Sequence, residues 1–361
     1  MSTISIHPSF RLNGTSIVPE ALQELAYSYI KEGAGYEAPI GAFLLDWLST
    51  SETLTVKTSG STGTPKQLVI KKRHMVNSAL ATGTFFGLQA GNTALHCLPT
   101  DFIAGKMMLV RAMVLGLRLT CVPPASNPLE STSAPFDFVA MVPLQLRNSI
   151  SKIDTIKTLI VGGAPFSNDL KELVRDRSAN IYETYGMTET ITHIALKRIN
   201  HLDDNQTANE NDSFKTLPNV KIGRDHRDCL VINAPNISDA EIITNDVVRL
   251  ISETEFQWLG RYDTIINSGG VKLIPEQIES ILSHLIPNRF FVAGFPDEKL
   301  GQKLVLLIEG KVTTKDTLDN IRRSGMLDQF SIPKELIRVP VFTETDNGKI
   351  DRTATLKSVI G

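Results

Sequence analysis

Short apolar runs alternate along the chain with segments in which apolar residues recur every three or four positions. A short apolar run indicates a buried strand, whereas the longer spacing indicates a helix that buries one face. The middle of the chain shows this alternation most clearly and predicts a strand over 136–141, a helical turn over 144–149, a strand over 158–161, a helix over 168–177 and a strand over 180–184. Strands joined by helices in this order favour parallel pairing through right-handed crossovers, so the sequence predicts an α/β fold.

The same patterns divide the rest of the chain. Ahead of the middle region we expect helices over 20–31 and 40–47, and the polar residues 201–218, rich in Asn and Asp, predict a surface loop. A smaller α+β pattern follows, with helices over 275–285 and 317–324 and strands over 289–294, 303–309 and 335–341. We therefore expect a large N-terminal domain over 1–262, with mixed and parallel sheets and helices, and a small C-terminal domain over 263–361.

Length and charge support this division and narrow the class of partners. A chain of 361 residues exceeds the size at which one hydrophobic core usually keeps growing. With a net charge of −2 and no long run of Lys or Arg, the sequence calls for neither a nucleic acid nor an anionic membrane as partner. The start of the chain lacks the pattern of a secretory signal, and no apolar run reaches about 18 residues, so we expect a cytoplasmic protein without membrane insertion. The oligomeric state is left open, with a homodimer as one option.

The three cysteines, Cys97, Cys121 and Cys229, are far apart in the sequence and form no CxxC pair. Metal sites built from Cys and His need such clustering. We therefore predict reduced thiols without a chemical role.

Residues 58–66 contain five hydroxyl side chains, two glycines and one lysine. Glycines allow backbone amides to approach phosphate oxygens, hydroxyls add donors, and the ammonium of Lys66 balances negative charge, so this stretch predicts a phosphate-binding loop. A Ser/Gly-rich surface loop is the alternative. The loop is not a Walker loop, because Lys66 follows Pro65 and the next residues, 67–71, favour a strand rather than a helix.

With its Pro-Lys ending, this loop resembles the signature of the acyl-adenylate-forming superfamily, which includes acyl-CoA synthetases, luciferases and the adenylation domains of peptide synthetases. Further motifs similar to those of the superfamily follow in the same order, from about residue 52 to 352: they lie at 162–165, 185–190, 244–246, 260–263, 268–272 and 347–352. The resemblance implies an ATP-dependent ligase that joins a carboxylate to AMP and then to the thiol of coenzyme A. It also implies that the small C-terminal domain is mobile.

The resemblance implies the following nucleotide contacts. The phosphate loop binds ATP through Thr58, Ser59, Gly60, Ser61, Thr62, Gly63 and Lys66. The segment Gly163, Ala164 and Pro165 lies against adenine, and Tyr185, followed by Gly186, stacks on it. The ribose hydroxyls are bound by Asp246, although Asn245 replaces a glycine of the superfamily motif, and Arg261 reaches the ribose or a phosphate.

The remaining implied roles concern catalysis. Thr188 bonds phosphate, Glu189 holds Mg²⁺, and Lys349 bridges the acyl carboxylate and the α-phosphate. A carboxylate at position 189 is reasonable because Mg²⁺ prefers hard oxygen ligands together with substrate phosphates. Asp263 is the pivot of the small domain.

Coenzyme A is expected to enter beside a hairpin with two glycines. Gly269 and Gly270 would allow the pantetheine arm to approach the backbone closely. Lys272 is a candidate for binding the phosphates of coenzyme A, with a solvated lysine as the alternative.

The acid pocket is expected around 97–105, which aligns with the superfamily's substrate motif; Gly105 is kept, and Phe102 stands where His is common. Only about fifty residues precede the phosphate loop, and short ligases of this kind resemble those acting on o-succinylbenzoate in menaquinone biosynthesis. That acid has a second carboxylate, which could pair with Lys106 or Arg111; a lysine that reaches solvent is the alternative. Two alternative functions stay open. The protein could be another aryl- or acyl-CoA ligase, or it could be a non-catalytic nucleotide-binding or carrier-loading module.

Overall fold

A computed structural model describes residues 6–16, 19–57, 67–164, 166–202, 212–311, 314–344 and 350–360. The chain divides into two compact units. Unit 1 comprises Met1–Gly223, Ile232–Ile242 and Ile251–Phe256, and unit 2 comprises Arg224–Val231, Ile243–Leu250 and Gln257–Gly361. The segment 263–361 lies within unit 2, which also takes in two earlier segments. The boundary after residue 262 stays a prediction.

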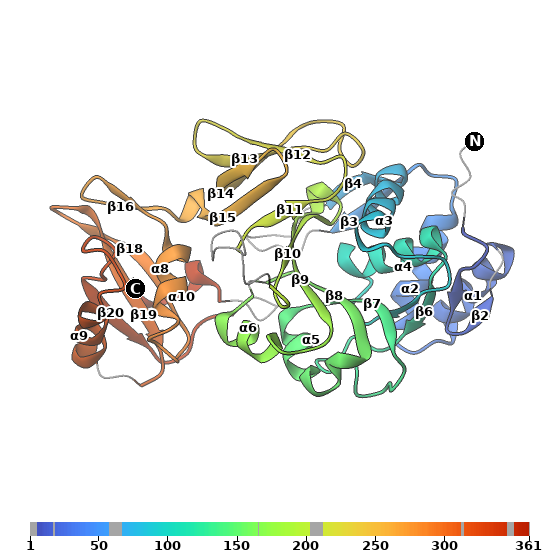
Figure 1. The fold of residues 1–361 in the computed structure, drawn as a ribbon, viewed down its shortest axis with the longest axis horizontal. Coiled ribbons are helices and arrows are strands. Elements are labelled where there is room, and N and C mark those ends of the chain that lie inside the picture. Colours follow the sequence, from blue (N-terminus) through green and yellow to red (C-terminus); the bar gives the residue numbers. More distant parts are fainter. Residues whose placement is uncertain are drawn as a thin grey trace. The chain divides into compact units, whose positions relative to one another are not determined.

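Unit 1 is built on a mixed sheet in the strand order β15-β11-β10-β9-β8-β7-β5-β6-β1-β2 (Figure 1). Its strands are β1 (Arg11–Leu12), β2 (Thr15–Ser16), β5 (Thr93–His96), β6 (Arg118–Cys121), β7 (Phe136–Met141), β8 (Ile156–Val161), β9 (Asn180–Gly186), β10 (His193–Arg198) and β11 (Phe214–Thr216). The strand β15 (Glu255–Arg261) contributes its first two residues to unit 1, and its other residues belong to unit 2. The strands β1, β6, β5, β7, β8 and β9 pair in parallel, which confirms the prediction made for β7, β8 and β9, and the pairs from β9 to β15 are antiparallel. A separate hairpin joins β3 (Thr53–Lys57) to β4 (Gln67–Lys71).

Helices cover both faces of this sheet. They are α1 (Pro19–Lys31), α2 (Glu37–Leu48), α3 (Lys72–Phe86), α4 (Ile103–Leu115), α5 (Pro143–Asn148) and α6 (Asn168–Val174), with the 3₁₀ turn η1 (Ile150–Thr155). On β9, Ile181 belongs to the cluster that includes α5 and α6, whereas the ring of Tyr182 packs against Phe85 and Phe86 of α3. Because neighbouring residues of a strand point to opposite faces, α3 and α6 lie on opposite sides of the sheet.

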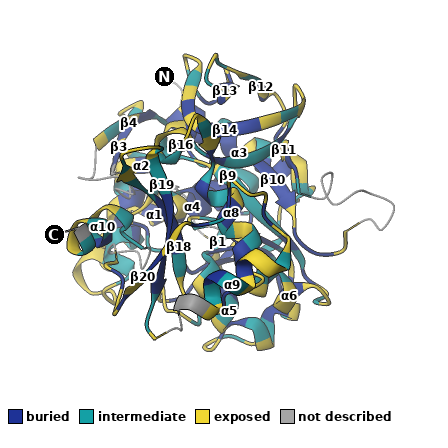
Figure 2. Ribbon diagram, turned by 90° about the vertical axis from the view of Figure 1, so that its left-hand side faces the viewer, coloured by how far each residue is buried: buried dark blue, intermediate teal, exposed yellow. Residues whose placement is uncertain are grey.

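Unit 2 contains a second sheet in the order β17-β16-β19-β18, with β20 parallel to β19. The strands are β16 (Ile266–Ser268), β17 (Val271–Leu273), β18 (Phe290–Asp297), β19 (Gly301–Glu309) and β20 (Glu335–Val339), and the helices are α8 (Pro275–Leu282), α9 (Thr314–Ser324) and α10 (Arg352–Ile360). Along β19, Leu304 and Leu306 pack into the cluster of α8 and α9, and Val305 and Leu307 pack with residues of α10. Helices thus cover both faces of β19, whose middle is buried in Figure 2.

Three further strands, β12 (Lys221–Arg224), β13 (Cys229–Asn233) and β14 (Ile242–Ser252), have residues in both units, and the 3₁₀ turn η3 (Tyr262–Thr264) follows β15. The predicted loop over 201–218 is wrong at its end, because residues Phe214–Thr216 form β11 and the side chain of Phe214 is buried against Phe256. Residues 203–211 lie outside the described part. All three cysteines are free, as predicted, and their side chains are buried. In the described ranges, no helix is both long and apolar enough to cross a membrane.

Candidate functional site

Three of the predicted motifs follow parallel strands of unit 1. Phe102 and Gly105 come after β5, Gly163 and Ala164 come after β8, and Tyr185 is the last residue but one of β9. Strands β5 and β7, β7 and β8, and β8 and β9 are parallel neighbours, so these segments meet at the carboxyl edge of the sheet. In open α/β sheets this edge is where ligands bind.

Close packing explains why glycine stands at key positions of these motifs. A Cβ atom on Gly105 would lie 2.2 Å from the carbonyl oxygen of Pro99, and one on Gly186 would lie 2.3 Å from that of Thr192. Gly163 adopts a φ of 83°, in the left-handed region that favours glycine. The motif glycines therefore bring backbone segments together at the carboxyl edge.

A tight turn after β9 presents Thr188 and Glu189. The hydroxyl of Thr190 donates to the carbonyl oxygen of Thr192 at 2.7 Å and accepts from the amide of Met187 at 2.9 Å, which closes the 3₁₀ turn η2 (Thr188–Thr190). Ile191 follows with φ 65° and ψ −56°, and the amide of Thr192 donates to the carbonyl oxygen of Thr190 at 2.7 Å. These values define a γ-turn of the strained kind, which is uncommon for a β-branched residue.

This turn leaves the carboxylate of Glu189 exposed beside the half-buried Thr188. Among the described residues, no group of three or more His, Cys, Asp or Glu side chains could hold a metal ion. Mg²⁺ needs no such cage, because it is usually held by one or two carboxylates together with waters and substrate phosphates. A single exposed Glu189 next to a hydroxyl fits an ion of that kind.

The half-buried ring of Tyr185, expected to stack on adenine, packs against aromatic neighbours. Its centroid lies 5.1 Å from that of Phe256 in an edge-on arrangement and 5.8 Å from that of Phe214. These two phenylalanines stack on each other at 5.5 Å. The aromatic cluster fixes the orientation of the Tyr185 ring.

Behind the η2 turn lies a buried cation, Arg111 of α4. Its Nε donates to the hydroxyl of Thr82 and its Nη2 to the hydroxyl of Thr192, both at 3.4 Å. Nη2 also contacts Nδ1 of His193 at 3.4 Å, and Nη1 contacts the sulfur of Met108 at 3.7 Å. All four contacts are long for hydrogen bonds, and one is to a weak acceptor.

Arg111 is 1% exposed, and no carboxylate of the described residues lies within ion-pair distance of its guanidinium. Burial lowers the pKa of Arg111 from 12.5 to about 9. Burial and the nearby guanidinium hold the pKa of His193 well below 6.5, so its imidazole is neutral at pH 7. The cluster therefore carries one positive charge without a described counter-ion.

Lys106, one turn earlier on α4, is satisfied differently. Its Nζ donates to the carbonyl oxygen of Thr100 at 2.5 Å and lies 5.6 Å from the ring centroid of Phe43. Burial lowers the pKa of Lys106, while the carboxylates of Asp101 and Asp46 raise it. Its surroundings are acidic, which is unfavourable for binding an anion.

In unit 2, the predicted residues Asp246, Arg261 and Asp263 come together. The guanidinium of Arg261 donates to both carboxylate oxygens of Asp263 at 2.9 and 3.0 Å and lies 3.9 Å from Asp246. Trp258 Nε1 donates to Asp246 at 3.2 Å. The hydrogen bonds from Arg261 lower the pKa of Asp263, although its burial opposes this.

Asn245, which replaces a glycine of the superfamily motif, lies within β14 without a left-handed φ. Its side-chain oxygen accepts from Arg227 at 3.0 Å. The conformation at this position therefore does not require glycine.

The expected glycine hairpin is present between β16 and β17. Gly269 and Gly270 have φ values of 60° and 84°, the conformation of a two-residue turn of type I′, and Ser268 pairs with Val271 across it. Lys272 is exposed on β17. The predicted residues Thr58, Ser59, Gly60, Ser61, Thr62, Gly63, Lys66, Pro165 and Lys349 lie outside the described part of the chain.

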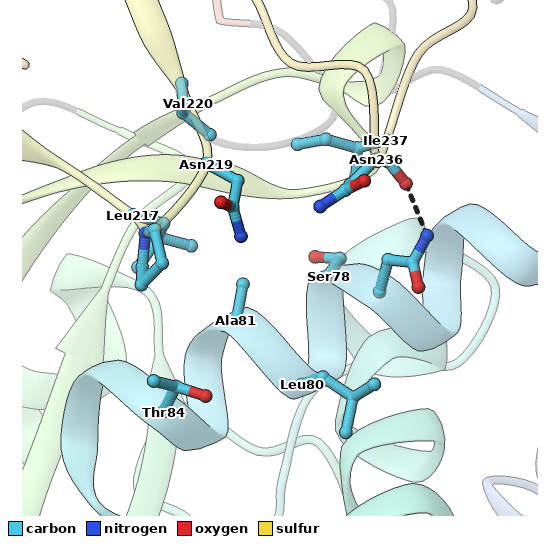
Figure 3. Close-up of a pocket in the computed structure, with 11 residues that line it drawn as sticks. Ser78, Leu80, Ala81, Thr84, Leu217, Asn219, Val220, Asn236 and Ile237 are labelled. Atoms are coloured by element: carbon cyan, nitrogen blue, oxygen red, sulfur yellow. Dashed lines mark hydrogen bonds between the residues drawn. The ribbon is translucent and has the colours of Figure 1, made fainter.

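A cavity of about 260 Å³ lies apart from these residues, between α3 and the loops at 217–220 and 236–237 (Figure 3). Its polar groups are uncharged, among them the hydroxyl of Ser78, for which the described residues supply no hydrogen-bond partner. A second cavity, of about 290 Å³, is lined by the segment 98–101 together with Tyr36, Ile40 and His96. Only the second cavity adjoins a predicted motif, the substrate segment 97–105.

Sequence reasoning missed His193 and Thr82 as parts of the site. His193 falls in the mainly apolar run that forms β10, and Thr82 lies in an ordinary amphipathic helix. The signal that was available is Arg111 itself, an unpaired charge within the apolar stretch 107–115.

Comparisons with known proteins identify the family of the chain. Residues 56–222 match the AMP-binding enzyme family. The chain is 36% identical to an acyl-CoA synthetase (AMP-forming)/AMP-acid ligase II-like protein from Dyadobacter fermentans, whose crystal structure aligns over 93% of this chain and 98% of that chain with a TM-score of 0.61.

Two further relatives carry more specific names. The 2-succinylbenzoate–CoA ligase of Listeria monocytogenes is 26% identical over 366 aligned positions, which cover 93% of this chain and 76% of the relative. The structure of an O-succinylbenzoate coenzyme A synthetase from Bacillus subtilis, in complex with ATP and magnesium ion, is 21% identical, with a TM-score of 0.69 over 84% of this chain and 69% of that chain. From the extent of the likeness to the Dyadobacter protein and the family match, this chain belongs to the AMP-binding enzyme family and is an acyl- or aryl-CoA ligase.

Proposed function

We propose that this ligase converts o-succinylbenzoate, ATP and coenzyme A into the coenzyme A thioester, AMP and pyrophosphate, as a step of menaquinone biosynthesis. The names of its relatives support the choice of acid. The observation that carries the choice is the buried guanidinium of Arg111, because it lacks a carboxylate partner among the described residues and lies against the turn of Thr188 and Glu189.

The first half-reaction forms an acyl-adenylate. A carboxylate oxygen of the acid attacks the α-phosphorus of ATP, the bond from that phosphorus to the bridging oxygen breaks, and pyrophosphate leaves with the electron pair. Negative charge grows on the phosphate oxygens, where Lys349 and the donors of residues 58–66 would stabilise it. Mg²⁺, when bound at Glu189, would supply further positive charge to the phosphates.

The second half-reaction transfers the acyl group. The sulfur of coenzyme A attacks the acyl carbon, its proton passes to solvent, and the bond to the AMP oxygen breaks, so AMP leaves. Gly269 and Gly270 would allow the pantetheine arm to approach their backbone, because neither has a side chain. Asp263, the expected pivot of the small domain, would allow that domain to move between the two half-reactions.

The acid has two carboxylates, and only one reacts. We propose that Arg111 binds the unreactive one, since a buried cation gains more from a desolvated anion than an exposed cation does. Lys106 is the weaker candidate because its ammonium is already held by the carbonyl oxygen of Thr100 and faces Asp101 and Asp46. A fatty acid offers no second carboxylate and would leave Arg111 unpaired.

The test is the release of pyrophosphate with and without coenzyme A, for o-succinylbenzoate, benzoate and a fatty acid at equal concentrations. We expect release that depends on coenzyme A, with kcat/KM for o-succinylbenzoate at least a hundredfold above that for the two monocarboxylates. A preference for a monocarboxylate would refute the proposed substrate and leave the ligase class intact. We also propose a cytoplasmic location, where ATP and coenzyme A are available; a homodimer stays a prediction.

A further inference from the structure

The contacts around Arg111 determine the tautomer of His193 and the direction of the Thr82 hydroxyl. A guanidinium has only N–H donors, so the contact from Arg111 to Nδ1 of His193 requires the lone pair of Nδ1. The proton of the neutral imidazole then sits on Nε2, which lies 3.3 Å from the hydroxyl oxygen of Thr82 and donates to it. The hydroxyl of Thr82 donates in turn to the carbonyl oxygen of Ser78 at 3.0 Å.

Thr82 is thus the common acceptor for two donors. Its oxygen receives the Nε–H of Arg111 at 3.4 Å and the Nε2–H of His193 at 3.3 Å. His193 and Thr82 are 4% and 0% exposed, so water has little access to replace these contacts. With Nε and one edge of Nη2 held in this way, the guanidinium has one orientation, and its Nη1 has only the thioether of Met108 as a described partner.

We propose that His193 is a positioning residue that, together with Thr82, orients the guanidinium of Arg111 so that its weakly bonded N–H groups face the unreactive carboxylate of the acid, and thereby sets the preference for dicarboxylates. The inference rests on the proposed function, because it requires that Arg111 bind this carboxylate. A protonated imidazole could not serve, since it would present an N–H and a positive charge to the guanidinium.

Two substitutions test the role of His193. His193→Phe removes both ring nitrogens from a buried site of similar shape, and Thr82→Val removes the shared acceptor at nearly constant volume. A hydrogen bond to a charged group accounts for about tenfold to a hundredfold in affinity. We therefore expect each variant to raise KM for o-succinylbenzoate by at least about tenfold, with kcat and the KM for benzoate within about threefold of the wild type.

Rescue and control variants separate positioning from a loss of packing. His193→Asn places an amide oxygen near the position of Nδ1, so it should recover part of the affinity for o-succinylbenzoate. His74→Phe is the matched control, because His74 is also a buried imidazole in unit 1, on α3, and its partners are Asp239 and Arg73. We expect this control to keep the wild-type KM for both acids.

The outcomes are distinguishable. If the wild type does not act on o-succinylbenzoate, the proposed function fails and this inference fails with it. If Arg111→Met raises KM for o-succinylbenzoate while both His193→Phe and Thr82→Val leave it unchanged, only the positioning role is refuted. Equal losses on the two acids would show a structural role and also refute it.

A spectroscopic test is independent of turnover. ¹⁵N NMR of the wild-type protein labelled at histidine should show the Nε2–H tautomer of His193, unchanged between pH 8 and pH 6. The Nδ1–H tautomer, or a protonated ring in this range, would overturn the proposed network.

Discussion

Replacing Arg111 by Met is expected to stabilise the unliganded protein and to weaken its binding of a dicarboxylic acid. The wild type keeps a guanidinium buried without a described counter-ion, and the variant replaces it by an apolar chain of similar length. Substituting well-packed apolar residues for buried charges is often neutral or stabilising. The substitution is thus expected to raise the stability of the unliganded protein and to lower its affinity for the acid.

The magnitude follows from the environment of the side chain. The fall in the pKa of Arg111 from 12.5 to about 9 corresponds to about 5 kcal/mol of unfavourable free energy for keeping the cation buried. The variant loses the donor to Nδ1 of His193, and an unsatisfied buried acceptor costs about 1 to 3 kcal/mol. The hydroxyls of Thr82 and Thr192 lose a partner as well, but Thr82 keeps its bonds to His193 and Ser78. We expect a net gain of about 2 kcal/mol, or a rise in Tm of about 4 °C or more.

The assay combines thermal unfolding of the ligand-free protein with steady-state kinetics on o-succinylbenzoate and benzoate. The matched control is Arg147→Met, because Arg147 forms an exposed ion pair with Asp169, and such pairs contribute about 0 to 1 kcal/mol. For Arg111→Met we expect a higher Tm together with a KM for o-succinylbenzoate raised at least a hundredfold. A lower Tm with unchanged KM would show that Arg111 is a structural residue, and the argument from its missing counter-ion would be wrong.

Three further predictions follow from the site. Lys349→Ala should slow acyl-adenylate formation by about 10² to 10³, with much less effect on thioester formation from a preformed adenylate, as measured by single-turnover kinetics; equal effects on both half-reactions would contradict its assigned role. Lys106→Met should leave the KM for o-succinylbenzoate within about threefold, and a tenfold rise would transfer the anion-binding role from Arg111 to Lys106. Burial lowers the pKa of His96 from 6.5 to about 4, so its stabilising contribution is present above pH 6.5 and is lost as the pH falls towards 4. The free energy of unfolding in urea should therefore fall between pH 6.5 and pH 5 by about 2 kcal/mol less in His96→Leu than in the wild type. The same fall in both proteins would show that His96 does not cause it.

The sequence predicts the central elements well where the apolar pattern is unambiguous. The strand expected over 136–141 is β7 with the same limits, because a run that is apolar on both faces is typical of a strand covered by helices on both sides. The β11 strand was missed because three residues between polar segments give no periodicity. Phe214 is buried by its pairing with Phe256 of β15, which lies 42 positions further along the chain. Such a strand is determined by its neighbours rather than by its own pattern.

The motif residues could be predicted from the sequence, but the packing that requires these residue types could not. The glycines at 105 and 186 were identified by resemblance, and the structure adds that any side chain there would meet a backbone carbonyl at little more than 2 Å. The network of Arg111 was beyond prediction, because Thr82, Arg111 and His193 come from α3, α4 and β10, and no local pattern relates them. The sequence favoured Lys106, with Arg111 as the alternative, and the surroundings of the two side chains favour Arg111 instead.

Two features of unit 1 break local rules, and they occur side by side. Arg111 places an unpaired charge in an apolar helix, and Ile191 places a β-branched residue in a strained turn next to Thr192, which contacts Arg111. Each costs free energy in the ligand-free protein, of the order of 1 to 3 kcal/mol for the turn. A fold under selection for stability alone would lose both, since Met at 111 and Gly at 191 are simple replacements. Both unfavourable free energies arise at one turn, beside Thr188 and Glu189, and a bound ligand that offsets them explains why they persist. The positive charge of Arg111 requires that this ligand be a desolvated anion.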